Sequence, residues 1–250
     1  MTYIEPIYFT LYSVAGGVGK TTLSVALTYH FVKYCERVGC AVLLWSADYE
    51  KDDTITRYFG GSAPSGSYDW ALLERPHRYS RTLYLYSSPY ARKLYETGKV
   101  EEALKRLLMA IAKLPSYLKD MRAPVAIVVL DLPKYIKPVI EVNGSRIEVL
   151  DLLREMTNTV FVATMEESSS FGTDAYKYAL QYAGSIVVNK ATDFKHLTVS
   201  GYKTIIRYDR RLASSPDARV TYSVLRKAGV SVDHSGKKTD IFTAFSRLVL

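Results

Sequence analysis

The stretch Gly16-Gly17-Val18-Gly19-Lys20-Thr21-Thr22 decides how this chain is organised. An apolar run from Ile7 to Tyr12 precedes it and is typical of a buried strand. Residues 23–33 follow it, with apolar side chains at helical spacing. The sequence therefore predicts a strand, a glycine-rich loop and a helix. In that order, backbone N–H groups and the N-terminus of a helix form an anion site.

We expect this loop to bind the phosphates of a nucleotide. Its three glycines let the backbone wrap around a phosphate without Cβ clashes. The Lys20 ammonium would reach the β- and γ-phosphate oxygens, and the Thr21 hydroxyl would bind Mg²⁺. The loop departs from the common G-x-x-x-x-G-K-[ST] string because Val14 stands at the first glycine position. It matches the variant with two adjacent glycines before x-G-K-T. The alternative is a glycine-rich turn with an incidental lysine.

Length and composition indicate one α/β domain with a full core. The 250 residues are 48% hydrophobic and 23% charged. Apolar runs such as Val125 to Leu130 are too short to cross a bilayer, and the N-terminus has no signal-peptide pattern. We therefore expect a cytoplasmic protein with a single domain, residues 1–250, and no transmembrane segment. In that compartment Cys35 and Cys40 are expected to be free thiols rather than a disulfide.

Positive charge is concentrated near the C-terminus. The chain has a net charge of +8, and residues 195–250 hold eleven Lys or Arg against four Asp, a net of +7. Such a cluster suits a phosphate backbone or an anionic membrane surface, and the alternative is an ordinary solvated face. The candidate contacts for DNA phosphates are Arg207, Arg210, Arg211, Arg219, Arg226 and Lys227.

Strands and helices alternate along the rest of the chain. The pattern predicts strands at 41–45, 82–86, 124–130, 159–164, 185–188 and, as the last, 203–207. It predicts helices at 70–73, 100–114 (ending at Pro115), 168–183, 221–228 and 239–250. Residues 139–149 read as a hairpin around Asn143-Gly144. This alternation predicts a doubly wound, mostly parallel sheet flanked by helices.

Polar side chains follow several of these strands at the point where each one ends. Asp48, Asp131 and Asn189 occupy such positions. Ligands of parallel sheets bind beyond the carboxyl ends of the strands, so these side chains are expected to meet the glycine loop. Asp131 ends an apolar strand, where an unpaired buried carboxylate is costly and Mg²⁺ or its waters would satisfy it. A helix cap is the alternative for Asp131.

With these motifs in place, the sequence resembles the ParA/MinD family of deviant-Walker P-loop ATPases, and more closely its ParA partition branch. The similarity spans roughly residues 5–250 and is strongest in the glycine loop. Val128 to Pro133 resembles the family's D-x-P Walker B motif. The strand ending Ser46-Ala47-Asp48 is similar to its second acidic motif, usually D-x-D, with Ser46 in place of the first Asp. Residues 205–211 and 228–230 loosely resemble its C-terminal segment.

The resemblance implies slow ATP hydrolysis, with ATP or ADP and Mg²⁺ as cofactors. It assigns phosphate binding to the loop from Gly16 to Thr22 and metal binding to Thr21 and Asp131. Catalysis would rest on Lys20, Asp131 and Asp48, the last of which orients the attacking water. Asp52 and Asp53 are alternatives for that role. Asn189 takes the place of the family's base-contacting Asn.

The resemblance also implies partners: nonspecific DNA on the nucleoid, and a centromere-binding or cargo adaptor protein. The family's hallmark lysine, which crosses a homodimer to the other subunit's phosphates, is replaced by Ala15. Alanine carries no charge, so ATP-driven dimerisation of the usual kind is not implied. Two other functions stay open. One is a MinD-like membrane or protein-positioning switch in which residues 239–250 target a membrane instead of packing in the core. The other is a nonhydrolytic, nucleotide-stabilised scaffold, suggested by Ala15 and Ser46.

Overall fold

A ten-stranded mixed sheet forms the centre of the protein. The computed structural model describes residues 5–13, 16–47, 58–59, 77–87, 97–133, 139–166, 177, 181–190, 202–214 and 216–248. The strands of this sheet are β1 (Ile7–Ser13), β2 (Ala41–Ser46), β3 (His77–Arg78), β4 (Leu83–Ser87), β5 (Val125–Asp131), β8 (Thr159–Glu166), β9 (Ser185–Asn189), β10 (Tyr202–Ile206), β11 (Gly229–Val232) and β12 (Lys238–Asp240).

The strand order is β12-β11-β10-β9-β8-β1-β5-β2-β4-β3. Every neighbouring pair from β10 to β4 is parallel. Among the described strands of this sheet, antiparallel pairs occur only at the two edges, where β3 joins β4 and where β11 and β12 follow β10. The expected doubly wound, mostly parallel sheet is confirmed. The expectation that residues 203–207 form the last strand is wrong, because the chain turns back after α9 and adds two short antiparallel strands.

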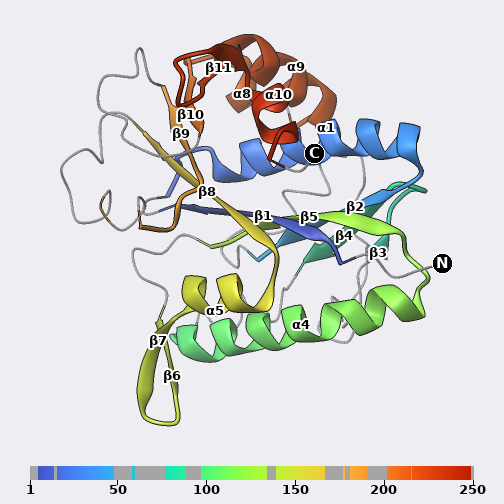
Figure 1. Ribbon diagram of the computed structural model, residues 1–250, viewed down its shortest axis with the longest axis vertical. Helices are drawn as coiled ribbons and strands as arrows, with labels where there is room; N and C mark the ends of the chain where they lie inside the picture. The colour runs from blue at the N-terminus through green and yellow to red at the C-terminus, as the bar shows by residue number, and fades with distance from the viewer. Residues whose placement is uncertain are drawn as a thin grey trace.

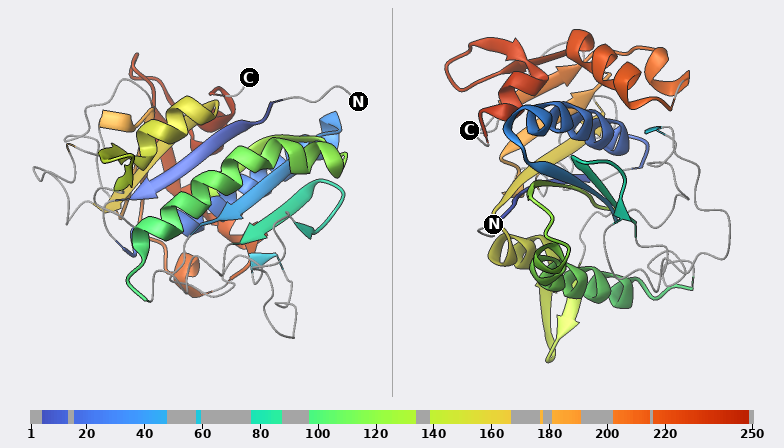
Figure 2. Two further views of the ribbon diagram at one scale, coloured as in Figure 1. Left: turned by 90° about the horizontal axis from the view of Figure 1, so that it is seen from below. Right: turned by 90° about the vertical axis from the view of Figure 1, so that its right-hand side faces the viewer.

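Helices cover both faces of the sheet (Figure 1). One face carries α1 (Lys20–Val38), α8 (Arg211–Ser214), α9 (Ala218–Ala228) and α10 (Ile241–Ser246). The other face carries α4 (Val100–Asp120) and α5 (Val149–Met156), which lie side by side in both views of Figure 2. Successive residues of a strand point to opposite faces, so Phe9 and Leu11 enter the first layer and Tyr8 and Tyr12 the second. All four side chains are buried.

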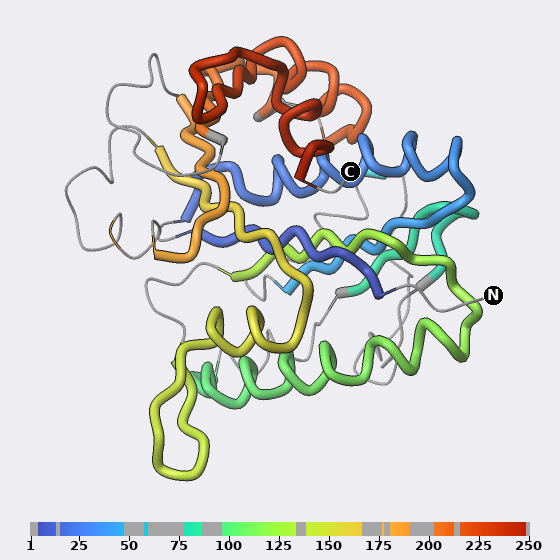
Figure 3. Tube along the Cα trace, viewed as in Figure 1, coloured from blue at the N-terminus to red at the C-terminus, as the bar shows by residue number. Residues whose placement is uncertain are grey.

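The hairpin predicted around Asn143-Gly144 is present as β6 (Val139–Val142) and β7 (Ser145–Glu148). Asn143 and Gly144 both have positive φ angles, 51° and 79°, as a two-residue turn with the twist of a hairpin requires. This two-stranded unit projects from the α4 and α5 side, beyond the end of both helices (Figure 3). It is separate from the main sheet.

Helix α4 does not end at Pro115 as expected. It continues to Asp120 with Pro115 inside it. A proline removes one N–H donor from the helix interior, but here the apolar stripe runs on past it. Ile111, Leu114 and Leu118 are all buried against the sheet. Packing of this face therefore outweighs the lost backbone hydrogen bond.

The expectation of free thiols is also wrong, since Cys35 and Cys40 form a disulfide. Helix α1 ends at Gly39, whose φ of 81° turns the chain back so that the N–H groups of Gly39 and Cys40 both donate to the carbonyl of Cys35. This turn brings the two Cα atoms to 4.5 Å. The expectation rested on cellular compartment alone and ignored the geometry of the helix end.

The final helix packs in the core, which was one of its two expected roles. Ile241, Phe242 and Phe245 of α10 are buried against the layer that contains α1. Over the described residues, no helix combines the length and apolarity that a membrane span requires. The predicted helix at 70–73, most of the one at 168–183, and Ala15, Asp48, Asp52 and Asp53 lie outside the described residues.

Candidate nucleotide-binding site

Lys20 and Asp131 meet at the centre of the sheet. The glycine loop follows β1, and the parallel pairing of β1 with β5 places Asp131 beside Leu11 near the end of both strands. Lys20 is the first residue of α1, and its Nζ lies 2.5 Å from Asp131 Oδ1. The two side chains are 6% and 0% exposed. The loop lysine and the strand-end carboxylate predicted from sequence are therefore one buried ion pair.

Asp131 has one more feature that bears on metal binding. Its second oxygen, Oδ2, is buried and has no hydrogen-bond partner among the residues that the structure describes. Burying a carboxylate oxygen without a partner costs free energy, and a hard cation is the ligand that would satisfy it. Thr21, next to Lys20, supplies a hydroxyl at the start of the same helix. The side chains present therefore fit Mg²⁺.

The backbone of the loop has the shape that anion binding requires. Gly17 and Gly19 adopt left-handed conformations, with φ angles of 76° and 82°. Gly19 is the N-cap residue of α1 and has no side chain that could occupy the N–H groups of the first helical turn. Those N–H groups and the positive end of the helix dipole are suited to a phosphate.

Asn189 packs directly on this loop. It ends β9, and its Nδ2 donates a hydrogen bond to the carbonyl oxygen of Val18. A Cβ atom added to Gly19 would clash with Asn189 Nδ2, so Asn189 can hold this position only against glycine. The structure thus brings together the loop and the residue predicted to contact the base.

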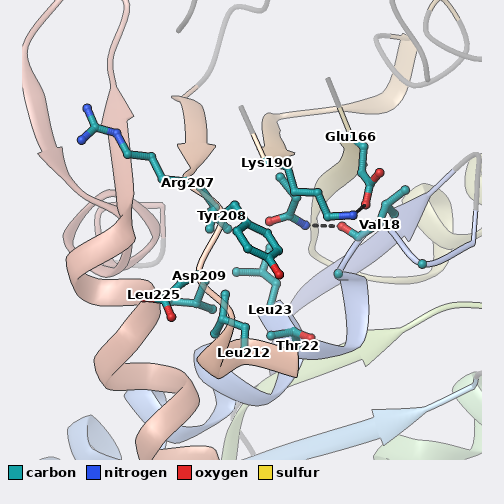
Figure 4. Close-up of a pocket in the computed structure, with 14 residues that line it drawn as sticks. Val18, Thr22, Leu23, Glu166, Lys190, Arg207, Tyr208, Asp209, Leu212 and Leu225 are labelled. Atoms are coloured by element: carbon teal, nitrogen blue, oxygen red, sulfur yellow. Dashed lines mark hydrogen bonds and ion pairs between the residues drawn. The ribbon is translucent and has the colours of Figure 1, made fainter. Parts of the chain in front are cut away.

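A cavity of about 320 Å³ opens beside the loop and Asn189 (Figure 4). Its other walls come from α1, from the end of β8 and from the segment that follows β10. An ion pair of 2.6 Å between Lys190 and Glu166 lies on one side of it. Sequence reasoning missed Glu166 and Tyr208, both of which line the cavity. Their positions within two residues of the ends of predicted strands were the signal that could have identified them.

The six basic residues predicted to contact DNA occupy different settings. Arg207 borders the cavity, but its guanidinium points away from it (Figure 4). Arg211 pairs with Asp209 at 2.5 Å, and this arginine lowers the pKa of Asp209 to about 2. The remaining four are exposed, three of them on α9: Arg210, Arg219, Arg226 and Lys227.

Two basic residues that were not predicted extend the positive surface onto α1. Lys33 is exposed and places its ammonium 4.9 Å from the ring centre of Tyr29 and 5.4 Å from that of Tyr222 on α9. Arg37 is exposed one turn further along α1. Burial lowers the pKa of nearby His30 to about 4, with smaller contributions from positive charges that include Arg37 and Lys33. Only their spacing of four residues on one helix could have indicated this surface.

Solved structures share this architecture across nearly the whole chain. An ATP complex of a McdA variant from Cyanothece has a TM-score of 0.53 at 12% identity, covering 91% of this chain and 97% of its own. A plasmid partition protein from Borrelia burgdorferi has a TM-score of 0.53 at 15% identity, covering 90% and 99%. The septum site-determining protein MinD from Pyrococcus horikoshii, complexed with Mg-ADP, has a TM-score of 0.51 at 12% identity, covering 90% and 96%.

The chain has the ParA/MinD-type P-loop ATPase fold. This confirms, at the level of the fold, the resemblance drawn from the loop and the strand ends. Sequence comparison adds nothing to it, because neither a protein-family model nor a curated protein matches the chain. Within the ParA/MinD-type fold, the loop, Asp131 and Asn189 lie on one edge of the sheet, as the sequence predicted.

Proposed function

We propose that this protein binds ATP with Mg²⁺, hydrolyses it slowly and acts as a ParA-like ATPase in plasmid or chromosome segregation. The observation that carries the proposal is the buried Lys20–Asp131 pair beneath the glycine loop, in which Asp131 Oδ2 accepts no hydrogen bond from any described residue. The solved structures add support, since MinD is described with Mg-ADP and the McdA variant with ATP.

Each part of the site has a role in this chemistry. The loop N–H groups and Lys20 would hold the β- and γ-phosphates, because phosphoryl transfer depends on positioning and charge neutralisation. Thr21 and Asp131 would hold Mg²⁺, which when bound neutralises negative charge on the phosphates. Asn189 would contact the base, and Asp48 would orient the attacking water.

Lys20 also links the phosphates to the rest of the protein. In this structure its ammonium is bonded to Asp131. Contact with phosphate oxygens would draw Lys20 away from Asp131 and leave that carboxylate to the metal. Asp131 leads toward the β6–β7 hairpin, so we propose that ligand state is passed on through this segment.

The DNA part of the proposal rests on the exposed positive charges of α9 and α1. Arg219, Arg226 and Lys227 would contact DNA phosphates without sequence preference, and Lys33 and Arg37 extend the same charge. The partition-protein neighbour supports this role and an adaptor partner. We place the protein in the cytoplasm on the nucleoid, as a single ATPase domain over residues 1–250. With Ala15 in place of the hallmark lysine, the proposal does not include dimerisation driven by ATP.

A MinD-like positioning role is the second candidate, favoured by the MinD and McdA neighbours. Its membrane form would need the apolar stripe of α10 to leave the core, where Ile241, Phe242 and Phe245 are buried. Sedimentation with anionic liposomes, with and without residues 239–250, separates the two candidates. ATP-dependent sedimentation that needs these residues would favour the positioning role.

The nucleotide proposal is tested by equilibrium binding of radiolabelled ATP with and without Mg²⁺. We expect the wild type to bind, Thr21→Ala to lose the dependence on Mg²⁺, and Lys20→Ala to lose most of the affinity. Lys105→Ala is the matched control, because Lys105 forms an exposed ion pair with Glu101 on α4, far from the loop. A wild type that binds no ATP with Mg²⁺ present would refute the proposal.

Hydrolysis and DNA binding need their own measurements. We expect phosphate release to be slow in the wild type and to fall to background in Asp48→Ala. Equal background in both proteins would support the scaffold alternative instead. Duplex DNA should bind with an affinity that falls steeply with salt. ATP binding without any salt-sensitive DNA binding would refute the partition role.

A further inference from the structure

We propose that Tyr208 is the residue on which the base of the nucleotide stacks, and that it sets the affinity for the base. The inference rests on the proposed function and deepens it, because it assigns the cavity beside the glycine loop to a purine ring. Tyr208 was not among the residues predicted from sequence.

The sheet places Tyr208 next to the base-contacting candidate. Strands β9 and β10 are parallel, and their register sets Ile206 beside Asn189. Tyr208 follows two residues later, where the chain leaves the sheet. In Figure 4 its ring lies across the cavity, between Lys190 on one side and Leu23 on the other. Residues far apart in sequence therefore meet at one position beside the loop.

The exposure of Tyr208 is unusual for an aromatic side chain in a concave site. The residue is 71% exposed, more than any other large hydrophobic residue in the described part of the chain. Over the same residues it forms no hydrogen bond and no contact with another ring. Tyrosine has two rotatable side-chain bonds and a rigid, wide face, so it offers contact area at low entropic cost. A ring held at the edge of a cavity in this way is suited to cover a planar ligand.

The chemistry of the walls agrees with a purine. Leu23, Leu212 and Leu225 make one side apolar, and the volume of about 320 Å³ lies at the lower end of the range for small-molecule sites. Every base presents a π-face, and stacking on an aromatic side chain is a general means of holding one. The polar atoms at the cavity would then form hydrogen bonds with the edge of the purine ring.

Asn189 determines which edge of the purine ring can bind at the cavity. One of the two N–H groups of its Nδ2 donates to the carbonyl of Val18. Asn189 Oδ1, an acceptor, and the second Nδ2 N–H, a donor, are left for a ligand. Together they match the exocyclic amino group of adenine and the ring nitrogen beside it, the bidentate pairing by which asparagine recognises adenine. Tyr208 would supply affinity, and Asn189 would supply the choice of base.

The test compares two ligands that share their phosphates. Calorimetry is used to measure the binding of ATP and of inorganic tripolyphosphate, each with Mg²⁺, to wild type, Tyr208→Ala and Tyr208→Phe. We expect Tyr208→Ala to bind ATP about tenfold more weakly, and Tyr208→Phe to stay within about twofold of wild type, because stacking needs only the ring. Tripolyphosphate should bind all three proteins equally.

Controls separate the ways in which the inference can fail. Val220→Ala changes an exposed apolar residue of α9 away from the cavity, and should leave both affinities unchanged. Thermal unfolding of each variant shows whether it is folded. Equal ATP affinity of Tyr208→Ala and wild type would overturn the inference while leaving the proposed function intact. A wild type that binds neither ligand would instead overturn the proposed function.

The same set of variants also tests whether Tyr208 contributes to DNA binding. Its neighbours Arg207, Arg210 and Arg211 are exposed and basic. Weaker binding of duplex DNA by Tyr208→Ala, together with unchanged ATP affinity, would overturn base stacking and assign the ring to DNA. Loss of ATP affinity with unchanged DNA affinity would support the inference.

Discussion

Two ion pairs in this protein have the same length and very different surroundings. Lys20 meets Asp131 at 2.5 Å in the centre of the sheet, with side chains 6% and 0% exposed. Arg211 meets Asp209 at 2.5 Å after β10, with side chains 57% and 19% exposed. Water screens the second pair and can replace either partner, whereas it reaches the first pair poorly. Distance alone therefore does not indicate what a charge contributes to stability.

The same contrast separates the functions proposed for the two regions. Buried charges beneath the glycine loop are held in fixed positions, as the recognition of a compact polyanion requires. Exposed charges on α9 and α1 are in contact with water, which suits binding to a long polyanion whose sequence is not read.

Removing the buried carboxylate should have the largest effect. Asp131→Ala takes away the acidic partner of a buried ammonium, which typically lowers the free energy of unfolding by about 3–5 kcal/mol. Urea denaturation of Asp131→Ala and wild type measures the difference. The matched variant Asp209→Ala, at the exposed pair, should leave the midpoint close to that of wild type. Similar midpoint shifts for the two variants would contradict the contrast.

Two glycines of the loop offer a second comparison. Gly17 and Gly19 both have positive φ, so either alanine variant is strained by about 1–2 kcal/mol. Only at Gly19 would the new Cβ also clash with the Asn189 side chain, while no atom of the described residues lies within 4 Å of a Cβ at Gly17. Gly19→Ala should therefore unfold at a lower urea concentration than Gly17→Ala. In the double variant Gly19→Ala/Asn189→Ala, the difference in urea midpoint from Gly17→Ala should become smaller. An unchanged difference would show that the close approach of Asn189 does not cause it.

His30 is a half-buried ionisable group among the exposed charges, and it should make stability depend on pH. Burial lowers its folded pKa from 6.5 to about 4, so the unfolded chain binds more protons between these values. Stability should fall as pH drops from 6.5 towards 4, by roughly 2 kcal/mol once partial exposure of the ring is allowed for. Urea titrations at pH 4.5 and 7 measure the change. In His30→Phe the free energy of unfolding should fall less between pH 7 and 4.5. An equal fall in both proteins would show that other groups cause the pH dependence.

Single charges on α9 should have the smallest effect. Arg219→Ala and Arg226→Ala should each weaken duplex DNA binding a few-fold and reduce the slope of log affinity against log salt by about 0.9. Fluorescence anisotropy at several salt concentrations gives both quantities. Lys113→Ala, on the exposed side of α4 across the sheet, is the control. If it weakened binding as much as the α9 variants do, DNA would not be bound through this face.

Most of the loop and strand architecture that carries the site could be predicted from the sequence. The loop, the strand before it and the apolar strands β2, β5, β8 and β9 carry strong local signals, because each is a short apolar run next to a polar residue. Parallel pairing then requires Asp131 and Asn189 to lie at the same edge as the loop. The contact of Asn189 with Val18, however, depends on the exact positions of β9 and the glycine loop relative to each other. No local sequence pattern predicts those positions.

The features that were missed depend on contacts between distant segments or on the geometry of a turn. The disulfide follows from the turn at Gly39, and the continuation of α4 past Pro115 follows from the burial of Leu118. Tyr208 has no motif of its own and gains its position from the pairing of β9 with β10. The antiparallel strands β11 and β12 are too short for their pattern to stand out.

The projecting hairpin, taken together with the disulfide, has a practical consequence. Both cysteines of the chain are joined to each other, so a thiol introduced elsewhere would be the sole one available for chemical labelling. Ser145 is exposed beside the turn at the far tip of the hairpin, well clear of the packed layers. A fluorophore attached through Ser145→Cys would therefore sit on the arm that follows Asp131 in the chain, where it could report in real time when the occupant of the glycine loop changes.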